Sequence, residues 1–249
     1  MKKYFLTLSL ILSLVAKTNA TVYFSGNNTI NYKINDNVQI NGGTTNIIAG
    51  AYITSYLNSY GFTNIKGGQI DGVVYSRNSS KISVSGGVLN DRLYNRAEVE
   101  VSGGTIHGMF ESYANAQGTI TGGNFTDWVA AWGKSEITIS GGNMTALRAY
   151  EDSQVTITGG TFTDSWDEII ATHNGIITIS GSGFNCGYGE IPVGSGILTG
   201  ILDNGEPINN NFKIIHYGEG YDGAKIVLVP EPATLLLLGL GGLVLRRKH

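Results

Sequence analysis

Residues 137–144 read Ile137-Thr138-Ile139-Ser140-Gly141-Gly142-Asn143-Met144, and this phrase decides the fold. It alternates apolar and hydroxyl side chains and then reaches a glycine pair. Copies of the phrase place their first glycines at Gly67, Gly86, Gly103, Gly122, Gly141, Gly159 and Gly181. A period near 19 residues with one short alternating strand per copy is typical of a solenoid, in which each repeat forms one coil.

The alternation has period two, so each phrase predicts a strand with one side facing inward and one facing outward. One apolar position recurs at Val84, Val101, Ile120, Ile139, Ile157 and Ile179. A second recurs beyond the glycines at Leu89, Ile106, Phe125, Met144, Phe162 and Phe184. Coils stacked about 4.8 Å apart would bury each column as a ladder of like side chains. We therefore predict an all-β, single-domain parallel β-helix (β-solenoid) of about seven or eight coils. Right-handed winding is favoured over a left-handed hexapeptide helix, because no six-residue repeat occurs.

The two ends of the repeat differ from its middle. We expect residues 21–61 to form an N-terminal cap and first coil, and residues 62–186 to form the Gly-Gly repeat. Residues 187–228 read as hairpin-type strands with a turn at Asn204-Gly205. They are predicted to form a C-terminal β cap, because an open solenoid end exposes unpaired strand edges.

The N-terminus has the pattern of a secretory signal peptide. Lys2 and Lys3 precede an apolar run at 4–16, and Thr18-Asn19-Ala20 ends in small residues. Residues 1–20 are therefore predicted to be a signal peptide that is cleaved after Ala20. The exported, functional part is then about residues 21–229.

Composition restricts the partners of that part. Residues 21–229 hold ten Lys/Arg and eighteen Asp/Glu, a net charge of −8. Such a surface repels phosphate backbones, so nucleic acid is excluded as an expected partner. Acidic polysaccharides are also disfavoured unless a metal ion bridges the charges. The single cysteine, Cys186, cannot form a disulfide within the chain, and we interpret it as a small packed residue.

The C-terminal tail, residues 229–249, has three parts. Val229-Pro230-Glu231-Pro232 comes first, an apolar run at 233–245 follows, and Arg246-Arg247-Lys248 ends the tail. The prolines stop a preceding strand or helix. A helix over the apolar run would span roughly 20 Å, short of a bilayer core, and the basic end would stay cytoplasmic.

This order of parts resembles the PEP-CTERM sorting signal of Gram-negative bacteria. The resemblance implies that an exosortase-type transpeptidase reads Pro230, Glu231 and Pro232, with the apolar segment as a transient transmembrane helix. It also implies surface display or release, usually alongside exopolysaccharide. The alternative is a plain membrane anchor, which would leave the Pro-Glu-Pro segment unexplained.

The sequence predicts no catalytic, metal or cofactor site. Asp91, Asp127 and Asp164 share one register at alternate repeats, and we interpret them as solvated turn residues. Asp167 and Glu168 supply oxygen ligands suited to Ca²⁺, but adjacent acids are usually just exposed. The histidines His107, His173 and His216 have no ligand spacing. A polysaccharide lyase or glycoside hydrolase remains the alternative function.

Two features support binding instead. Aromatic residues occupy the variable halves of the coils, and the candidate glycan contacts are Trp128, Trp132, Tyr150 and Trp166. The rows of outward-facing Ser and Thr side chains are similar to those of ice-binding proteins, so ice binding is a minor alternative function. We therefore expect an exported surface or matrix β-solenoid with a structural, adhesive or glycan-binding role, and exopolysaccharide as a partner.

Overall fold

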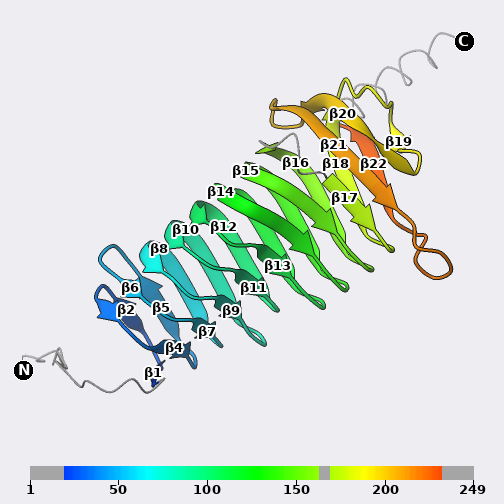
Figure 1. Cartoon of the computed structure of the whole chain (residues 1–249). Coiled ribbons are helices and arrows are strands. Elements are labelled where there is room, and N and C mark those ends of the chain that lie inside the picture. Colours follow the sequence, from blue (N-terminus) through cyan, green and yellow to red (C-terminus); the bar gives the residue numbers. More distant parts are fainter. Residues whose placement is uncertain (1–19, 163–168, 232–249) are drawn as a thin grey trace, which may run out of the picture.

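The computed structural model describes residues 20–162 and 169–231. They form an all-β parallel solenoid of about eight turns, as the sequence predicted. No helix occurs within these two ranges. The coils advance from the blue end at β1 to the orange and red end at β21 and β22 (Figure 1).

Each coil contributes strands to three faces, which are joined at corners. Face 1 contains β1 (Thr21–Phe24), β4 (Asn37–Ile40), β7 (Leu57–Ser59), β9 (Val74–Ser76), β11 (Leu93–Asn95), β13 (Phe110–Ser112), β17 (Ile169–Thr172) and β21 (Pro207–Ile215), with the ends of β14 and β15. Face 2 contains β2 (Asn28–Ile30), β5 (Thr44–Ile47), β18 (Ile176–Ser182) and β22 (Lys225–Pro230).

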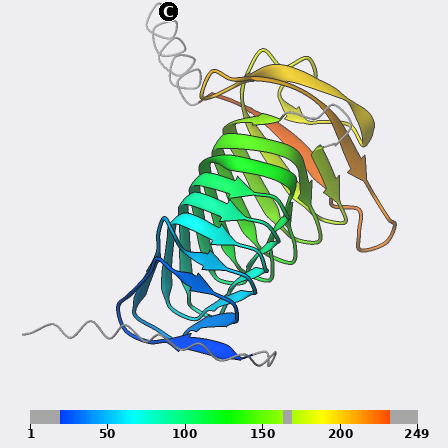
Figure 2. The same cartoon turned by 60° about the vertical axis from the view of Figure 1, so that its left-hand side comes forward.

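Six long strands belong to more than one face, because they turn a corner at the glycine pair. They are β8 (Phe62–Ile70), β10 (Lys81–Leu89), β12 (Glu98–Ile106), β14 (Gln117–Ala131), β15 (Glu136–Ala149) and β16 (Gln154–Phe162). Their first halves lie in face 2, and their later parts lie in face 3 with β3 (Lys33–Ile34) and β6 (Tyr52–Ile53). Figure 2 shows the resulting stack of similar coils.

The two glycines of each phrase do different work at this corner. Gly104 has φ +86°, a backbone conformation that L side chains rarely adopt. A Cβ on Gly103 would lie 2.7 Å from the carbonyl oxygen of Ser85 in the preceding coil. The second glycine therefore permits the turn, whereas the first permits close stacking of coils.

The interior includes the two predicted ladders and a further column on face 1, which runs through Val74, Leu93, Phe110, Val129, Leu147 and Ile169. Val84 pairs with Val101, and the column continues through Ile120, Ile139, Ile157 and Ile179, all buried. The second column is buried from Leu89 to Met144, and Phe162 and Phe184 pack against it only partly buried. Like side chains repeat at the same register, which fills the core without changing its shape from coil to coil.

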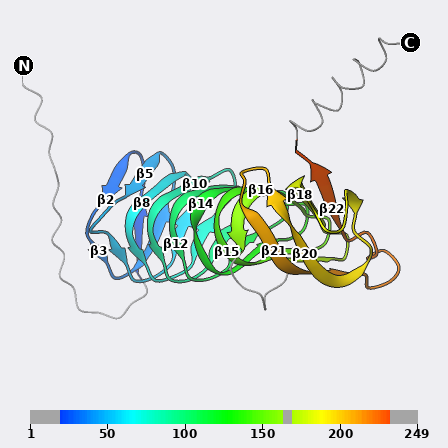
Figure 3. The same ribbon diagram turned by 90° about the horizontal axis from the view of Figure 1, so that it is seen from above.

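The C-terminal end combines parallel and antiparallel strands. β20 (Gly194–Leu202) and β21 form an antiparallel hairpin, and the Gly205 amide donates to the Leu202 carbonyl at the predicted Asn-Gly turn, at 2.8 Å. β20 also pairs antiparallel with the end of β18, and β19 (Gly189–Glu190) with β22. Residues 21–61, which we expected to form an N-terminal cap and first coil, supply β1 to β7. These strands are part of the same three faces as the later coils. Figure 3 shows β22 at the end of the stack away from β2 and β3.

Candidate functional site

Face 1 differs from the other faces in its outward side chains. Its middle column, in register from β7 to β15, consists of Asn58, Tyr75, Tyr94, Glu111, Ala130 and Arg148. Two residues further along each coil lie Tyr60, Arg77, Arg96, Tyr113, Trp132 and Tyr150. The corresponding outward column of face 2 is Ser83, Glu100, Thr119, Thr138, Thr156 and Thr178. Aromatic and arginine side chains therefore gather on one face of the solenoid.

Five aromatic rings form a ladder from coil to coil. Tyr75 stacks on Tyr94 with centroids 5.3 Å apart, and Trp132 stacks on Tyr150 at 3.8 Å. Tyr113 bridges the two pairs, at 5.6 Å from Tyr94 and 6.0 Å from Trp132. All five side chains are half-buried. Neighbouring rings cover one another's faces, so the ladder presents mainly ring edges and hydroxyl groups to solvent, and each contact adds about 0.5–1.5 kcal/mol beyond area burial.

Arginines pack against these rings. The Arg77 guanidinium lies 4.2 Å from the centroid of Tyr75, and that of Arg148 lies 3.2 Å from the centroid of Trp128. Arg148 also donates from Nη1 to the Tyr150 hydroxyl at 3.2 Å. Such cation–π contacts hold each guanidinium in a fixed position on the face.

Two further arginines are exposed on the same face. Arg92 lies 6.0 Å from the centroid of Tyr94 and donates from Nη1 to the Tyr94 hydroxyl at 2.8 Å. This hydrogen bond raises the pKa of Arg92 further above its ordinary value. Arg96 lies 5.9 Å from the centroid of Tyr113. In the next coil Met109 takes the position of Arg92, since its carbonyl accepts from the Leu93 amide as that of Arg92 accepts from the Val74 amide.

The ladder lies in the middle column at Tyr75 and Tyr94, and in the column two residues further along from Tyr113 onward. Glu111 takes the middle position in the coil of Tyr113, and it is only 6% exposed. Its Oε1 accepts a hydrogen bond from the Tyr113 hydroxyl at 2.9 Å. Its buried Oε2 has no hydrogen-bond partner among the described residues. Burial and the bond to Glu111 raise the pKa of the Tyr113 phenol, which therefore stays protonated as a donor. We call the ladder, Trp128, Glu111 and the four arginines the aromatic–arginine face.

Three of the four candidate glycan contacts lie on this face. The structure stacks Trp132 on Tyr150 and links Trp128 to Tyr150 through Arg148. Trp166 lies outside the described residues. Tyr75 was not identified from the sequence as a residue of this face. Its 19-residue spacing from Tyr94 matches the repeat and could have indicated it.

The predicted turn carboxylates bond to their own backbone. Asp91 Oδ1 accepts from the Arg92 amide and Asp127 Oδ1 from the Trp128 amide, each at 2.8 Å. Gly108 stands between them in the intervening coil, and Asp164, Asp167 and Glu168 lie outside the described ranges. Within those ranges no group of three or more His, Cys, Asp or Glu side chains is placed to hold a metal ion.

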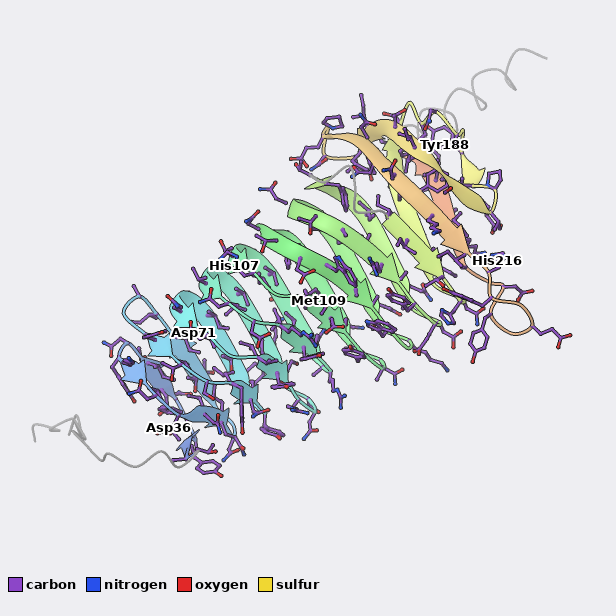
Figure 4. The ribbon with its side chains drawn as sticks, in the orientation of Figure 1. Asp36, Asp71, His107, Met109, Tyr188 and His216 are labelled. Carbon is purple, nitrogen blue, oxygen red and sulfur yellow. The ribbon has the colours of Figure 1, made fainter. Side chains whose placement is uncertain are left out.

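Another carboxylate, Asp71, lies at the end of the face 3 segment of β8. It accepts hydrogen bonds from Tyr52 Oη at 2.6 Å, Gln69 Nε2 at 2.6 Å and Asn90 Nδ2 at 2.8 Å. These bonds, Tyr52 first, lower the pKa of Asp71. His107 lies on the same side of the solenoid (Figure 4), where its Nδ1 is 3.3 Å from the Thr126 hydroxyl.

Cys186 corrects an expectation. The sequence suggested a small packed residue, but the thiol is exposed in the loop after β18. The repeat ends at this point, so no following coil covers the side chain.

The start of the C-terminal tail belongs to the folded body. Val229 and Pro230 end β22 and pair in parallel with Ser180 and Gly181 of β18. The Ser182 hydroxyl donates to Glu231 Oε1 at 3.0 Å. Ser182 itself is half-buried, and Pro232 lies outside the described residues.

These features define a parallel β-solenoid whose last strand leads directly into a Pro-Glu-Pro segment. A family model described as the PEP-CTERM protein-sorting motif matches residues 228–248. The chain therefore carries this sorting motif at its C-terminus, and the motif implies export, cell-surface sorting and processing by an exosortase. No curated protein and no solved structure matches the chain. The part of the chain that the structure describes contains no helix able to cross a membrane.

Proposed function

We propose that this protein is a cell-surface or matrix solenoid that binds glycans through the aromatic–arginine face. Export begins with the signal peptide at 1–20, and the tail at 229–249 is read by an exosortase. The solenoid works by binding along its length rather than by catalysis.

The concentration of aromatic and arginine side chains on face 1 carries this proposal. The guanidinium groups and the Tyr94 and Tyr150 hydroxyls offer hydrogen-bond donors in a row that crosses several coils. A long glycan can meet several such groups at once, so weak single contacts combine through effective concentration. The stacked rings hold these donors in place, which reduces the ordering cost of binding.

Binding of the full chain, purified in detergent, to immobilised neutral and acidic polysaccharides tests the proposal. We expect retention that is reduced by Trp128→Ala and Arg148→Gln together. Thr119→Ala and Thr138→Ala on face 2 are the matched control and should bind like the wild type. Failure of every polysaccharide to bind, or equal losses for both pairs of variants, would contradict a glycan-binding face 1.

A further inference from the structure

The charge on the aromatic–arginine face is opposite in sign to that of the protein as a whole. Residues 21–229 carry a net charge of −8, but this face holds four arginines and one glutamate. Among the described residues, the ion pairs join Lys81 to Glu98 and Glu100, and Lys225 to Glu190. Arg77, Arg92 and Arg96 thus form no ion pair with a carboxylate of the described residues, although Glu111 and Asp91 act on Arg92 from further away.

The packing of these arginines leaves their charge available. Arg77 rests its flat face on Tyr75 and uses Nε to bond Asn58 Oδ1 at 3.2 Å. The remaining N–H groups of a stacked guanidinium lie along its edge, where they suit two-point pairing with a carboxylate. Arg77 and Arg96 occupy the same position in consecutive coils, about 4.8 Å apart in rise. A polymer with regularly spaced anionic groups matches such a row.

We propose that the aromatic–arginine face binds an acidic polysaccharide, whose carboxylates pair with Arg77, Arg92 and Arg96. This inference rests on the glycan-binding function proposed above and names the class of glycan. Net charge alone disfavours an acidic polysaccharide. Arginines that touch the ligand outweigh the more distant acidic side chains, however, because salt screens charges at a distance.

The ladder geometry favours a polysaccharide over single-stranded nucleic acid. Nucleic-acid bases bind by stacking on free aromatic faces. On this face the rings stack on one another, and Trp132 and Tyr150 are only 3.8 Å apart. The groups left for a ligand are ring edges, phenol hydroxyls and guanidinium edges, which suit the hydroxyl and carboxylate groups of uronic acids.

Polygalacturonate and its methyl ester provide the test, because they share the same sugar ring and differ in charge. The full chain in detergent is titrated with each polymer in the presence of a chelator, which removes metal bridging. We expect binding to polygalacturonate about tenfold or more tighter than to the ester, and weaker binding as salt rises. Arg92→Gln with Arg96→Gln should weaken binding about tenfold. Lys33→Gln with Lys66→Gln removes the same charge from other, exposed sites and should leave binding within about twofold.

The outcomes separate this inference from the broader one. Equal binding of both polymers would overturn the acidic class and leave glycan binding standing. Binding to neither polymer, nor to a neutral glucan, would overturn both. Equal losses for the arginine and lysine variants would overturn the site, and tighter binding to single-stranded DNA than to polygalacturonate would overturn the choice of partner.

A second inference rests on a separate observation, the pairing of β22 with β18. The strand contacts include Val229 and Pro230, and the Ser182 hydroxyl holds the Glu231 carboxylate at 3.0 Å. The first residues of the sorting motif are therefore part of the C-terminal coil. A chain segment can pair with the solenoid or enter an enzyme cleft in extended form, but not both at once.

We infer that folding of the last coil shields the start of the sorting motif, from Val229 to Glu231, so that processing requires the end of β22 to separate from β18. The hydrogen bond from the Ser182 hydroxyl to Glu231 Oε1 is one of the contacts that must break. Removing it should raise the fraction of time that the motif is free.

Pulse-chase labelling in the producing cell measures the rate of tail processing. We expect Ser182→Ala to speed processing about fivefold, and Ser182→Thr, which keeps the hydroxyl, to remain close to the wild type. Ser195→Ala, at an exposed position of β20, serves as the control for altered folding. An unchanged rate for Ser182→Ala, or an equal change for Ser195→Ala, would refute shielding by this contact.

Discussion

Replacing Ile139 with alanine tests the interior ladder at its centre. Ile139 is fully buried and lies in register between Ile120 and Ile157. The substitution removes three carbon atoms, and each buried CH₂ group contributes about 0.8 kcal/mol. The neighbouring coils are fixed by their own backbone pairing and can close little of the gap, so a cavity term adds to the loss. The free energy of unfolding should fall by about 2–5 kcal/mol.

Thr138→Ala is the matched control, because Thr138 is exposed on the opposite side of the same strand. Its expected effect is under about 0.5 kcal/mol. Urea denaturation followed by far-ultraviolet circular dichroism measures both variants against the wild type. Similar losses at positions 138 and 139 would refute the assignment of inward and outward side chains.

Three further predictions concern export, sorting and acid stability. Leu8→Asp with Leu10→Asp should block translocation, because charges oppose the apolar core of the signal peptide, and normal surface levels would contradict that assignment. Replacing residues 230–232 with alanines should block processing and leave a form that keeps its tail, is heavier by mass spectrometry and stays in the membrane. An intact His249 on the surface-displayed wild type would argue against processing. The pKa of Asp71 is lowered from 3.8, so its stabilising effect is present above about pH 4 and lost as pH falls through the folded pKa. Asp71→Asn should therefore lower the urea midpoint at pH 7 and lose less further stability than the wild type between pH 7 and pH 3.

Several features of the site depend on the tertiary structure. Glu111 is a charged residue in an outward column, and the sequence gives no reason to expect its burial. It lies in register between Tyr94 of the preceding coil and Ala130 of the next, and Tyr113 of its own coil donates a hydrogen bond to it. The docking of the sorting motif is similar, since Ser182 and Glu231 are 49 residues apart and meet only because β22 pairs with β18.

The sequence by itself determined the solenoid, its interior columns and the C-terminal motif. These are local and periodic properties, because the alternation sets which side chains face inward and the glycine pair sets each corner. The tertiary structure alone decided which variable residues meet on the outside. Tyr75, Tyr94, Tyr113, Trp132 and Tyr150 stack because spacings of 18 or 19 residues bring them into adjacent rungs. The coil from Tyr94 to its register partner Glu111 has only 17 residues, so the ladder changes column there. That change depends on the register between coils, which pairing of the backbone fixes and which no single repeat encodes.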